Sequence, residues 1–182
     1  RTLLALIQQQ GGLASGEPPS SKGYTPSVFS LLPRLLERSG RFQKGSITAY
    51  YTVLVEGDDM TEPVADAARG ILDGHIMLSR KLAQRAHYPA IDVLDSISRV
   101  AGDVISKEHA AARSQAVRLL ALYREVEDLV QIGAYARGSN AEYDVAIDME
   151  KSINGLLRQS GGDAAVFEES RQVLLKLAAQ SQ

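Results

Sequence analysis

The stretch His87-Tyr-Pro-Ala-Ile-Asp-Val-Leu-Asp-Ser-Ile-Ser-Arg99-Val100 is the most informative part of this 182-residue chain. Pro89 fixes its own φ and pushes Tyr88 toward an extended conformation. Residues 90–94 are mostly apolar and include two β-branched side chains, which predicts a short buried strand. Residues 95–98 carry side chains that hydrogen-bond locally, so we expect a turn before Arg99. A tyrosine ring can cover a base, and a guanidinium can bind phosphate oxygens with two donors.

More ordinary roles compete with this interpretation. A tyrosine before a proline is most often a packing residue, and an arginine after a turn most often forms a surface ion pair. The composition narrows the alternatives. Hydrophobic residues make up 45% of the chain, which is enough for a core, and the net charge is −2, which gives no support to a nucleic-acid partner. The chain has no cysteine, and it has no apolar run of the ~18 residues that a membrane span needs.

The first part of the chain predicts two elements separated by loops. Residues 1–10 indicate an apolar helix or strand, and the Gly-, Pro- and Ser-rich residues 16–23 indicate a loop. Residues 27–39 repeat apolar side chains at helical spacing, although Pro33 suggests a kink or a later start. Residues 46–55 are rich in Thr, Tyr, Val and Ile and predict a central strand.

An acidic loop, Glu56-Gly-Asp-Asp59, follows this predicted strand. Its two adjacent carboxylates, Asp58 and Asp59, suit either magnesium binding or acid–base chemistry, but turn formation and helix capping are the commoner roles. Thr61 is a good N-cap for a helix that we expect to run to Arg85, with His75 packed near its middle. A strand, a helix and the strand near residue 91 would form a βαβ unit in a parallel sheet. Ligands of such sheets bind at the carboxyl ends of the strands, and Arg99 lies just past one of them.

The remaining residues favour helices. Residues 106–132, 141–157 and 164–179 are predicted helices, with Ser106 as a cap and Gly133 as a stop. We therefore expect an α/β part over residues 1–103 and a helical domain over residues 104–182. His87 and His109 lack partners at metal-ligand spacing, so no metal site is predicted.

Several blocks resemble the catalytic subunits of rotary ATPases, and most closely their flagellar and type III protein-export relatives. In addition to the run from His87 to Arg99, the matching blocks occur in the order and spacing of that family across residues 12–180. The supporting blocks are Gly16-Glu-Pro-Pro19, Gly23-Tyr-Thr-Pro-Ser-Val-Phe29, Gly45-Ser-Ile-Thr-Ala49, Glu56-Gly-Asp-Asp59, Ile71-Leu-Asp-Gly-His75, Leu78-Ser-Arg80 and Ile132-Gly-Ala-Tyr135. Over the first dozen residues the sequence departs from the family, because Gln9 and Gln10 replace charged residues.

The resemblance implies the C-terminal half of a RecA-like P-loop NTPase domain, a parallel sheet with flanking helices, followed by the α-helical domain. It implies that Arg99 acts as a catalytic arginine finger on the ATP of a neighbouring subunit. It also implies that Tyr88, and in a second position Tyr135, contact the adenine ring. The phosphate-binding motif G-x-x-x-x-G-K-[ST] does not occur in these residues, and the chain begins with Arg1. We therefore expect a piece of a longer ATPase, with ATP and Mg²⁺ used by the intact enzyme and neither bound by this piece alone.

For the intact protein, the resemblance implies ATP hydrolysis that drives unloading and unfolding of flagellar export substrates. The expected partners are five further copies in a homohexamer, a central stalk protein, chaperone–substrate complexes and the export gate, in the cytoplasm at the inner membrane. Residues 17–24 and the loop after residue 55 would face the stalk. Two alternatives stay open: a virulence injectisome ATPase, and a non-catalytic module that binds chaperones through its helices and a stalk through loops 16–26 and 56–62.

Overall fold

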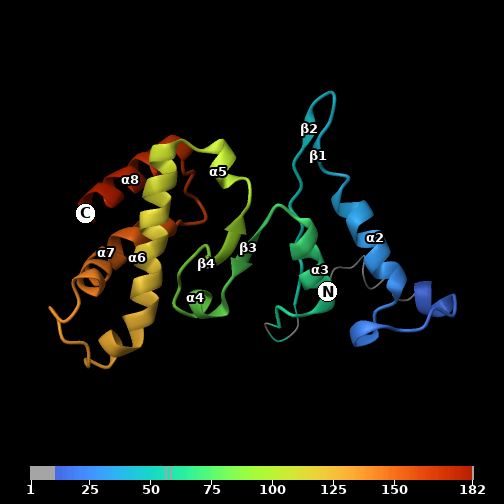
Figure 1. Ribbon diagram of the computed structural model, residues 1–182, viewed down its shortest axis with the longest axis horizontal. Helices are drawn as coiled ribbons and strands as arrows, with labels where there is room; N and C mark the ends of the chain where they lie inside the picture. Colours follow the sequence, from blue (N-terminus) through green and yellow to red (C-terminus); the bar gives the residue numbers. More distant parts are fainter. Residues whose placement is uncertain (1–10, 56, 58, 182) are drawn as a thin grey trace. The chain divides into compact units, whose positions relative to one another are not determined.

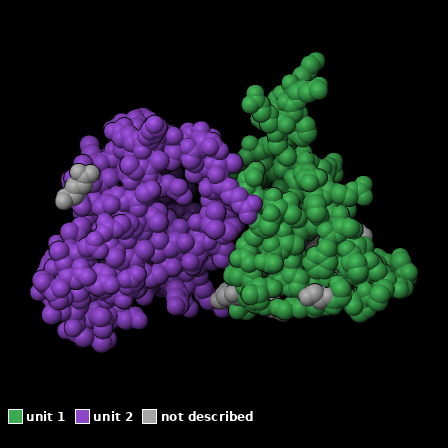
Figure 2. Space-filling model, in the orientation of Figure 1, with its two compact units in different colours: residues 1–73 green, residues 74–182 purple. Residues whose placement is uncertain are grey.

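The computed structural model describes residues 11–55, 57 and 59–181, so the element expected over residues 1–10 lies outside the described part. The chain divides into two compact units, residues 1–73 and 74–182 (Figure 2). The elements of the first unit are η1 (Ser21–Gly23), α2 (Pro26–Leu36), β1 (Gly40–Arg41), β2 (Ser46–Ile47) and α3 (Pro63–Ile71) (Figure 1). Those of the second are β3 (Gly74–Leu78), α4 (Arg80–Gln84), β4 (Ile91–Ser98), α5 (Ala101–Val104), α6 (Lys107–Gln131), α7 (Ala141–Leu157) and α8 (Phe167–Gln180).

Helices α2 and α3 form the core of the first unit. Apolar side chains recur four residues apart along α2, which places them on one face, and α3 supplies a matching stripe. The buried cluster consists of Tyr24, Val28, Leu32, Leu36, Val64 and Ala68. The helix expected over residues 27–39 is present but begins at Pro26, where a proline is preorganised for a first turn, and it continues through Pro33. The later start suggested by Pro33 is therefore wrong.

The central strand predicted over residues 46–55 is largely wrong. Among the described residues, strand pairing in this run is confined to β2, which pairs antiparallel with β1. Residues 50–55 keep the alternating burial of an extended segment, with Tyr51 and Val53 packed on the α2–α3 core and Tyr50 88% exposed. The side-chain pattern thus predicted the alternating burial correctly. A strand also needs a ladder partner, and a pattern within one segment cannot supply that information.

The long helix predicted over residues 61–85 is wrong beyond Ile71. The helix is capped by the carboxylate of Glu62 rather than by Thr61, and it ends at Leu72, which is extended. Residues 74–78 then form β3, because pairing with β4 outweighs the weak helical periodicity. Gly74 permits this pairing: a Cβ built there would lie 2.5 Å from the carbonyl oxygen of Ile97. His75 consequently lies on a strand, and its Nε2 is 3.1 Å from the carbonyl oxygen of Asp95.

Strand β4 contains the apolar run predicted as a strand but extends to Ser98, so the turn expected over residues 95–98 is wrong. These polar residues stay extended because the far end of β3 pairs with them, Gly74 with Ser98 and His75 with Ile97. The β3–β4 pair is antiparallel, as is the other ladder within the described residues, so the expected parallel βαβ connection is not formed there. The connection between the two strands, residues 79–90, contains the short helix α4 and returns the chain for antiparallel pairing.

The helical part agrees with the sequence-based expectation. Helix α6 spans the predicted residues with Ser106 as N-cap, Gly133 follows it with φ +70°, and α7 has the predicted bounds. Helix α8 begins three residues later than predicted. The apolar stripes of α6 and α7 meet in a core formed by Leu119, Ala146, Met149 and Ile153, against which Leu177 of α8 packs. The division at residues 103 and 104 stays a prediction, and the helices share one compact unit with β3 and β4.

Candidate functional site

Tyr88 and Arg99 lie beyond opposite ends of β4. Tyr88 precedes the strand and is 56% exposed, whereas Arg99 follows its last residue directly and is also exposed. A strand of eight residues spans about 26 Å. A strand of that length holds the ring and the guanidinium well apart, so the structure does not bring these two predicted residues together.

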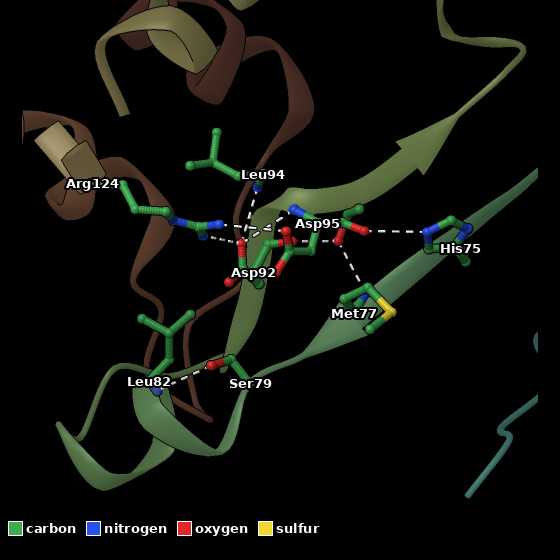
Figure 3. Close-up of polar contacts among 9 residues, drawn as sticks. His75, Met77, Ser79, Leu82, Asp92, Leu94, Asp95 and Arg124 are labelled. Atoms are coloured by element: carbon green, nitrogen blue, oxygen red, sulfur yellow. Dashed lines mark hydrogen bonds and ion pairs between the residues drawn. The ribbon is translucent and has the colours of Figure 1, made fainter. Parts of the chain in front are cut away.

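A polar network holds β4 against α6. The guanidinium of Arg124 on α6 donates to the carboxylates of Asp92, at 2.6 Å, and Asp95, at 3.4 Å (Figure 3). The same Asp92 carboxylate accepts the backbone N–H groups of Leu94 and Asp95 at 3.1 and 3.2 Å. Charge-assisted bonds of this kind are stronger than neutral ones, and Asp92 is mostly shielded from water. The carboxylate of Asp92, which lies within an apolar run of the sequence, therefore fixes the strand to α6 at a point between its ends.

A hydroxyl joins β4 to β3 where the ladder is irregular. The Oγ of Ser96 donates to the carbonyl oxygen of Asp92 at 2.5 Å and accepts the backbone N–H of Met77 at 2.9 Å. The register between the two strands shifts at this place, between His75 and Met77. The side chain thus replaces a ladder hydrogen bond and lets β4 continue to Ser98, directly before Arg99.

The Tyr88 end of the strand is fixed by the end of α7. The backbone N–H of Gln159 donates to the carbonyl oxygen of Tyr88 at 2.8 Å. His87 is 4% exposed, and its Nδ1 lies 3.5 Å from Nε of Arg158. Burial, and next the positive charge of Arg158, lower the pKa of His87 below the ordinary value of 6.5. The neutral ring therefore accepts the arginine donor at Nδ1.

Tyr135 lies in the connection between α6 and α7. Its hydroxyl lies within hydrogen-bond distance of two acceptors, the carbonyl oxygen of Asn140 at 3.1 Å and the carboxylate of Asp144 at 3.0 Å, and its ring meets Tyr143 edge-on. Arg85 in the turn after α4 forms an ion pair with Glu127, in the last turns of α6. The segment leading to Tyr88 thus lies near the end of α6 that continues into Tyr135. Arg99 precedes the opposite end of this helix, which is about 37 Å long.

Two loops of the first unit, predicted to face a stalk, are joined to each other. Lys22 forms an ion pair with Asp59, and the hydroxyl of Tyr24 donates to the buried carboxylate of Glu62 at 2.7 Å. The hydrogen bonds from Lys22 and then from Thr61 lower the pKa of Asp59 to about 2, so it is ionised at neutral pH. Asp58, which with Asp59 was considered above for magnesium binding or acid–base chemistry, lies outside the described residues, as does Glu56.

Sequence reasoning missed the residues that hold the predicted ones in place. Asp92 carried a weak signal, since its charge interrupts an apolar run, whereas Arg124 lies beside Glu125 outside the apolar stripe of its helix and carried none. Gln159 carried none, because it acts through its backbone N–H. In the described ranges no group of three or more His, Cys, Asp or Glu residues could hold a metal ion. No described helix is long and apolar enough to cross a bilayer.

Two protein families match adjacent parts of the chain. The ATP synthase alpha/beta family, nucleotide-binding domain, matches residues 2–98. The T3SS EscN ATPase C-terminal domain matches residues 105–176. The flagellum-specific ATP synthase of Bacillus subtilis (strain 168) is 52% identical over 176 residues, which is 97% of this chain and 40% of that protein. The chain therefore spans about two fifths of the length of this relative.

Solved structures agree with the family matches. The assembled ATPase EscN from the type III secretion system of enteropathogenic E. coli superposes with a TM-score of 0.92 at 46% identity, covering 96% of this chain and 42% of that one. EscN in complex with its central stalk EscO gives a TM-score of 0.85 at 45% identity, covering 96% and 41%. The expected α/β class with a C-terminal helical domain is thereby confirmed. The chain belongs to the ATP synthase alpha/beta family, in the branch of the flagellum-specific and type III secretion ATPases.

Proposed function

We propose that the chain is the C-terminal part of an ATPase that energises flagellar type III protein export. In this proposal six copies form a ring in the cytoplasm at the inner membrane. Each ATP site is completed by Arg99 of the neighbouring subunit, while Tyr88 contacts the adenine of its own subunit. The observation that carries the proposal is the placement of the two residues at opposite ends of β4. That separation suits residues that serve two different nucleotides.

The chemistry of Arg99 supports its part in the proposal. Charge builds on the γ-phosphoryl oxygens during transfer, and a guanidinium supplied by a second subunit can neutralise it without changing its own protonation. Arg99 is exposed at a strand terminus, where a side chain of this length can extend beyond its own subunit. The β3–β4 ladder and the Asp92–Arg124 ion pair fix the backbone from which it projects.

Tyr88 and Tyr135 suit contact with a base. Aromatic stacking contributes about 1–3 kcal/mol per base and discriminates weakly between purines. Tyr88 is 56% exposed, so its ring is accessible, and its segment lies near the helix end that leads to Tyr135. We assign Tyr88 the main contact and Tyr135 a second wall of the same pocket.

Hydrolysis in this account needs groups that lie outside the chain. The described residues offer no cluster of acids for Mg²⁺, and the sequence lacks the glycine-rich lysine motif that cradles phosphates. Mg²⁺ and the phosphate cradle are therefore assigned to the part of the enzyme that precedes these residues. Calorimetric titration of this chain with ATP should show little binding, whereas the full-length protein should bind and hydrolyse ATP. Tight ATP binding by the chain alone would contradict this division.

The central stalk is the partner that the loops of the first unit support best. Residues 17–24 and residues 59–62 are joined by one ion pair and one buried hydrogen bond, so they form a single firm surface. EscN, which the chain resembles, has been solved with a central stalk. We also propose chaperone–substrate complexes and the export gate as partners of the intact ring. Crosslinking from position 22 to a co-expressed stalk protein tests the first of these contacts.

The injectisome alternative differs in the exported substrates rather than in the site. The Ile132-Gly-Ala-Tyr135 run followed by Arg137-Gly-Ser139 favours the flagellar branch. Deleting the gene and scoring motility against effector secretion distinguishes the two. Loss of effector secretion with intact motility would replace the flagellar assignment with the injectisome assignment. The roles proposed for the site residues would stay the same. If no nucleotide were turned over by the full-length protein, the non-catalytic binding module would be the remaining account.

A further inference from the structure

Helix α7 ends in contact with the segment that carries Tyr88. The C-cap residue Arg158 still donates its own N–H to the carbonyl oxygen of Asn154 at 3.0 Å, but its backbone is extended, with ψ 140°. That change of conformation turns the next N–H, of Gln159, out of the helix. It donates instead to the carbonyl oxygen of Tyr88, 71 residues earlier in the sequence, at 2.8 Å.

We propose that Arg158 and Gln159 are positioning residues for Tyr88, through which the helical domain sets the orientation of the aromatic ring that contacts the nucleotide. The inference rests on the proposed function of Tyr88. It adds a structural link between the C-terminal helices and the nucleotide that is separate from the contact proposed for Tyr135.

The backbone bond is well placed for this purpose. The peptide group between Tyr88 and Pro89 is planar, so fixing its carbonyl oxygen also fixes the Cα of Tyr88, from which the ring projects. Pro89 has no N–H and restricts the conformation of Tyr88. The carbonyl oxygen of Tyr88 is therefore the hydrogen-bonding group through which this peptide can be held in place. A shift of the end of α7 would therefore be transmitted to the ring.

The adjacent side chains form a second contact between the same two segments. Nε of Arg158 lies 3.5 Å from Nδ1 of the buried His87, next to Tyr88. The carboxylate of Glu150, about two turns before Arg158 on α7 and oriented by a 2.6 Å hydrogen bond from Asn154, also acts on this histidine. His87 in turn donates its backbone N–H to the carbonyl oxygen of Leu82, at 3.0 Å. The segment is thus fixed on both sides just before the tyrosine.

A pair of substitutions at one position isolates the backbone bond. Gln159→Pro removes the N–H and, with the side chain, the 2.7 Å bond from Nε2 to the carbonyl oxygen of Asp163. Gln159→Ala removes only the latter, so it is the matched control. A proline after an extended C-cap residue fits the observed backbone of Arg158. Arg158→Ala tests the side-chain contact, and Arg118→Ala, which breaks an exposed α6–α7 ion pair, controls for a general effect on the helices.

The measurement is steady-state ATP hydrolysis by the full-length ring, with KM and kcat separated. Gln159→Pro and Arg158→Ala should each raise KM for ATP by about threefold to tenfold with little change in kcat, as expected when ground-state and transition-state binding are weakened equally. Gln159→Ala and Arg118→Ala should match the parent protein. If Gln159→Pro and Arg158→Ala also match it while Tyr88→Ala raises KM, the positioning role is overturned and the proposed function stands. If Tyr88→Ala itself leaves KM unchanged, the assignment of Tyr88 fails, and the positioning role fails with it.

Discussion

Strand β4 connects two regions that are held in different ways. Before it, His87 is buried, and Tyr88 accepts a hydrogen bond from the end of α7. After it, Arg99 is exposed, and the chain continues through a bend into α5. A fixed aromatic suits a ligand bound within its own subunit, whereas an exposed arginine suits a ligand presented from outside. Under the proposed function, this difference lets one strand serve two nucleotide sites, with a fixed ring at one end and an exposed guanidinium at the other.

The largest effect is expected at the exposed end. Arg99→Ala in the full-length enzyme should lower kcat by about 10³-fold or more, the range seen when an arginine finger is lost. Arg99→Lys should fail nearly as badly, because an ammonium lacks the planar pair of donors. ATP turnover measures both, and Arg113→Lys on the exposed side of α6 is the control. Near-normal turnover by Arg99→Lys would contradict a role that depends on guanidinium geometry.

At the fixed end, removal of the ring should weaken nucleotide binding rather than chemistry. Tyr88→Ala should raise KM for ATP by roughly fivefold or more, since base stacking is worth about 1–3 kcal/mol. Tyr88→Phe keeps the ring and should stay within about twofold of the parent protein. A loss of kcat in Tyr88→Ala as large as that in Arg99→Ala would erase the distinction between the two ends.

The β3–β4 ladder determines where Arg99 projects, and Gly74 is its most sensitive position. Gly74→Ala would place a Cβ 2.5 Å from the carbonyl oxygen of Ile97 and 3.1 Å from Cα of Ser98. We expect a loss of about 1–3 kcal/mol in the free energy of unfolding, typical of overpacking against backbone. Urea unfolding of the chain measures it. The control is Gly155→Ala in α7, where the added Cβ has nothing within 4 Å and should be neutral or stabilising. Equal stabilities of the two variants would exclude the close approach.

The smallest effect concerns pH. The pKa of His87 in the folded chain is below its unfolded value of 6.5, so the unfolded state binds more protons in the interval between the two values. The free energy of unfolding should therefore fall as the pH decreases through 6.5, and the decrease should level off below the folded pKa. His87→Gln cannot titrate and should remove this component from unfolding curves recorded between about pH 8 and about pH 5.5. If the free energies of unfolding of the two proteins changed with pH in parallel, the buried ring would contribute nothing to the pH dependence of stability.

The sequence predicted the helical part best. Ser106 as a cap, the apolar stripe after it and Gly133 as a stop are local signals, and α6 follows them closely. Residues 74–78 could not be assigned in this way, because their strand exists only through pairing with residues that lie about 20 positions later. The position of Arg99 after a strand was predictable from the run that begins at His87. The roles of Arg124 and Gln159 were not, since one depends on the packing of α6 on β4 and the other on a backbone N–H.

The central claim is that Arg99 acts on the nucleotide of a neighbouring subunit, and mixed rings test it most directly. Full-length Arg99→Ala subunits are mixed with subunits whose phosphate-cradle lysine, upstream of this chain, is replaced. Each type is inactive alone. In the mixture, every interface between an intact Arg99 and an intact cradle is complete, so ATP turnover should recover in proportion to the number of such interfaces. Turnover that stays at the level of the separate variants at all mixing ratios would contradict the claim, because it would place Arg99 and its ATP in the same subunit.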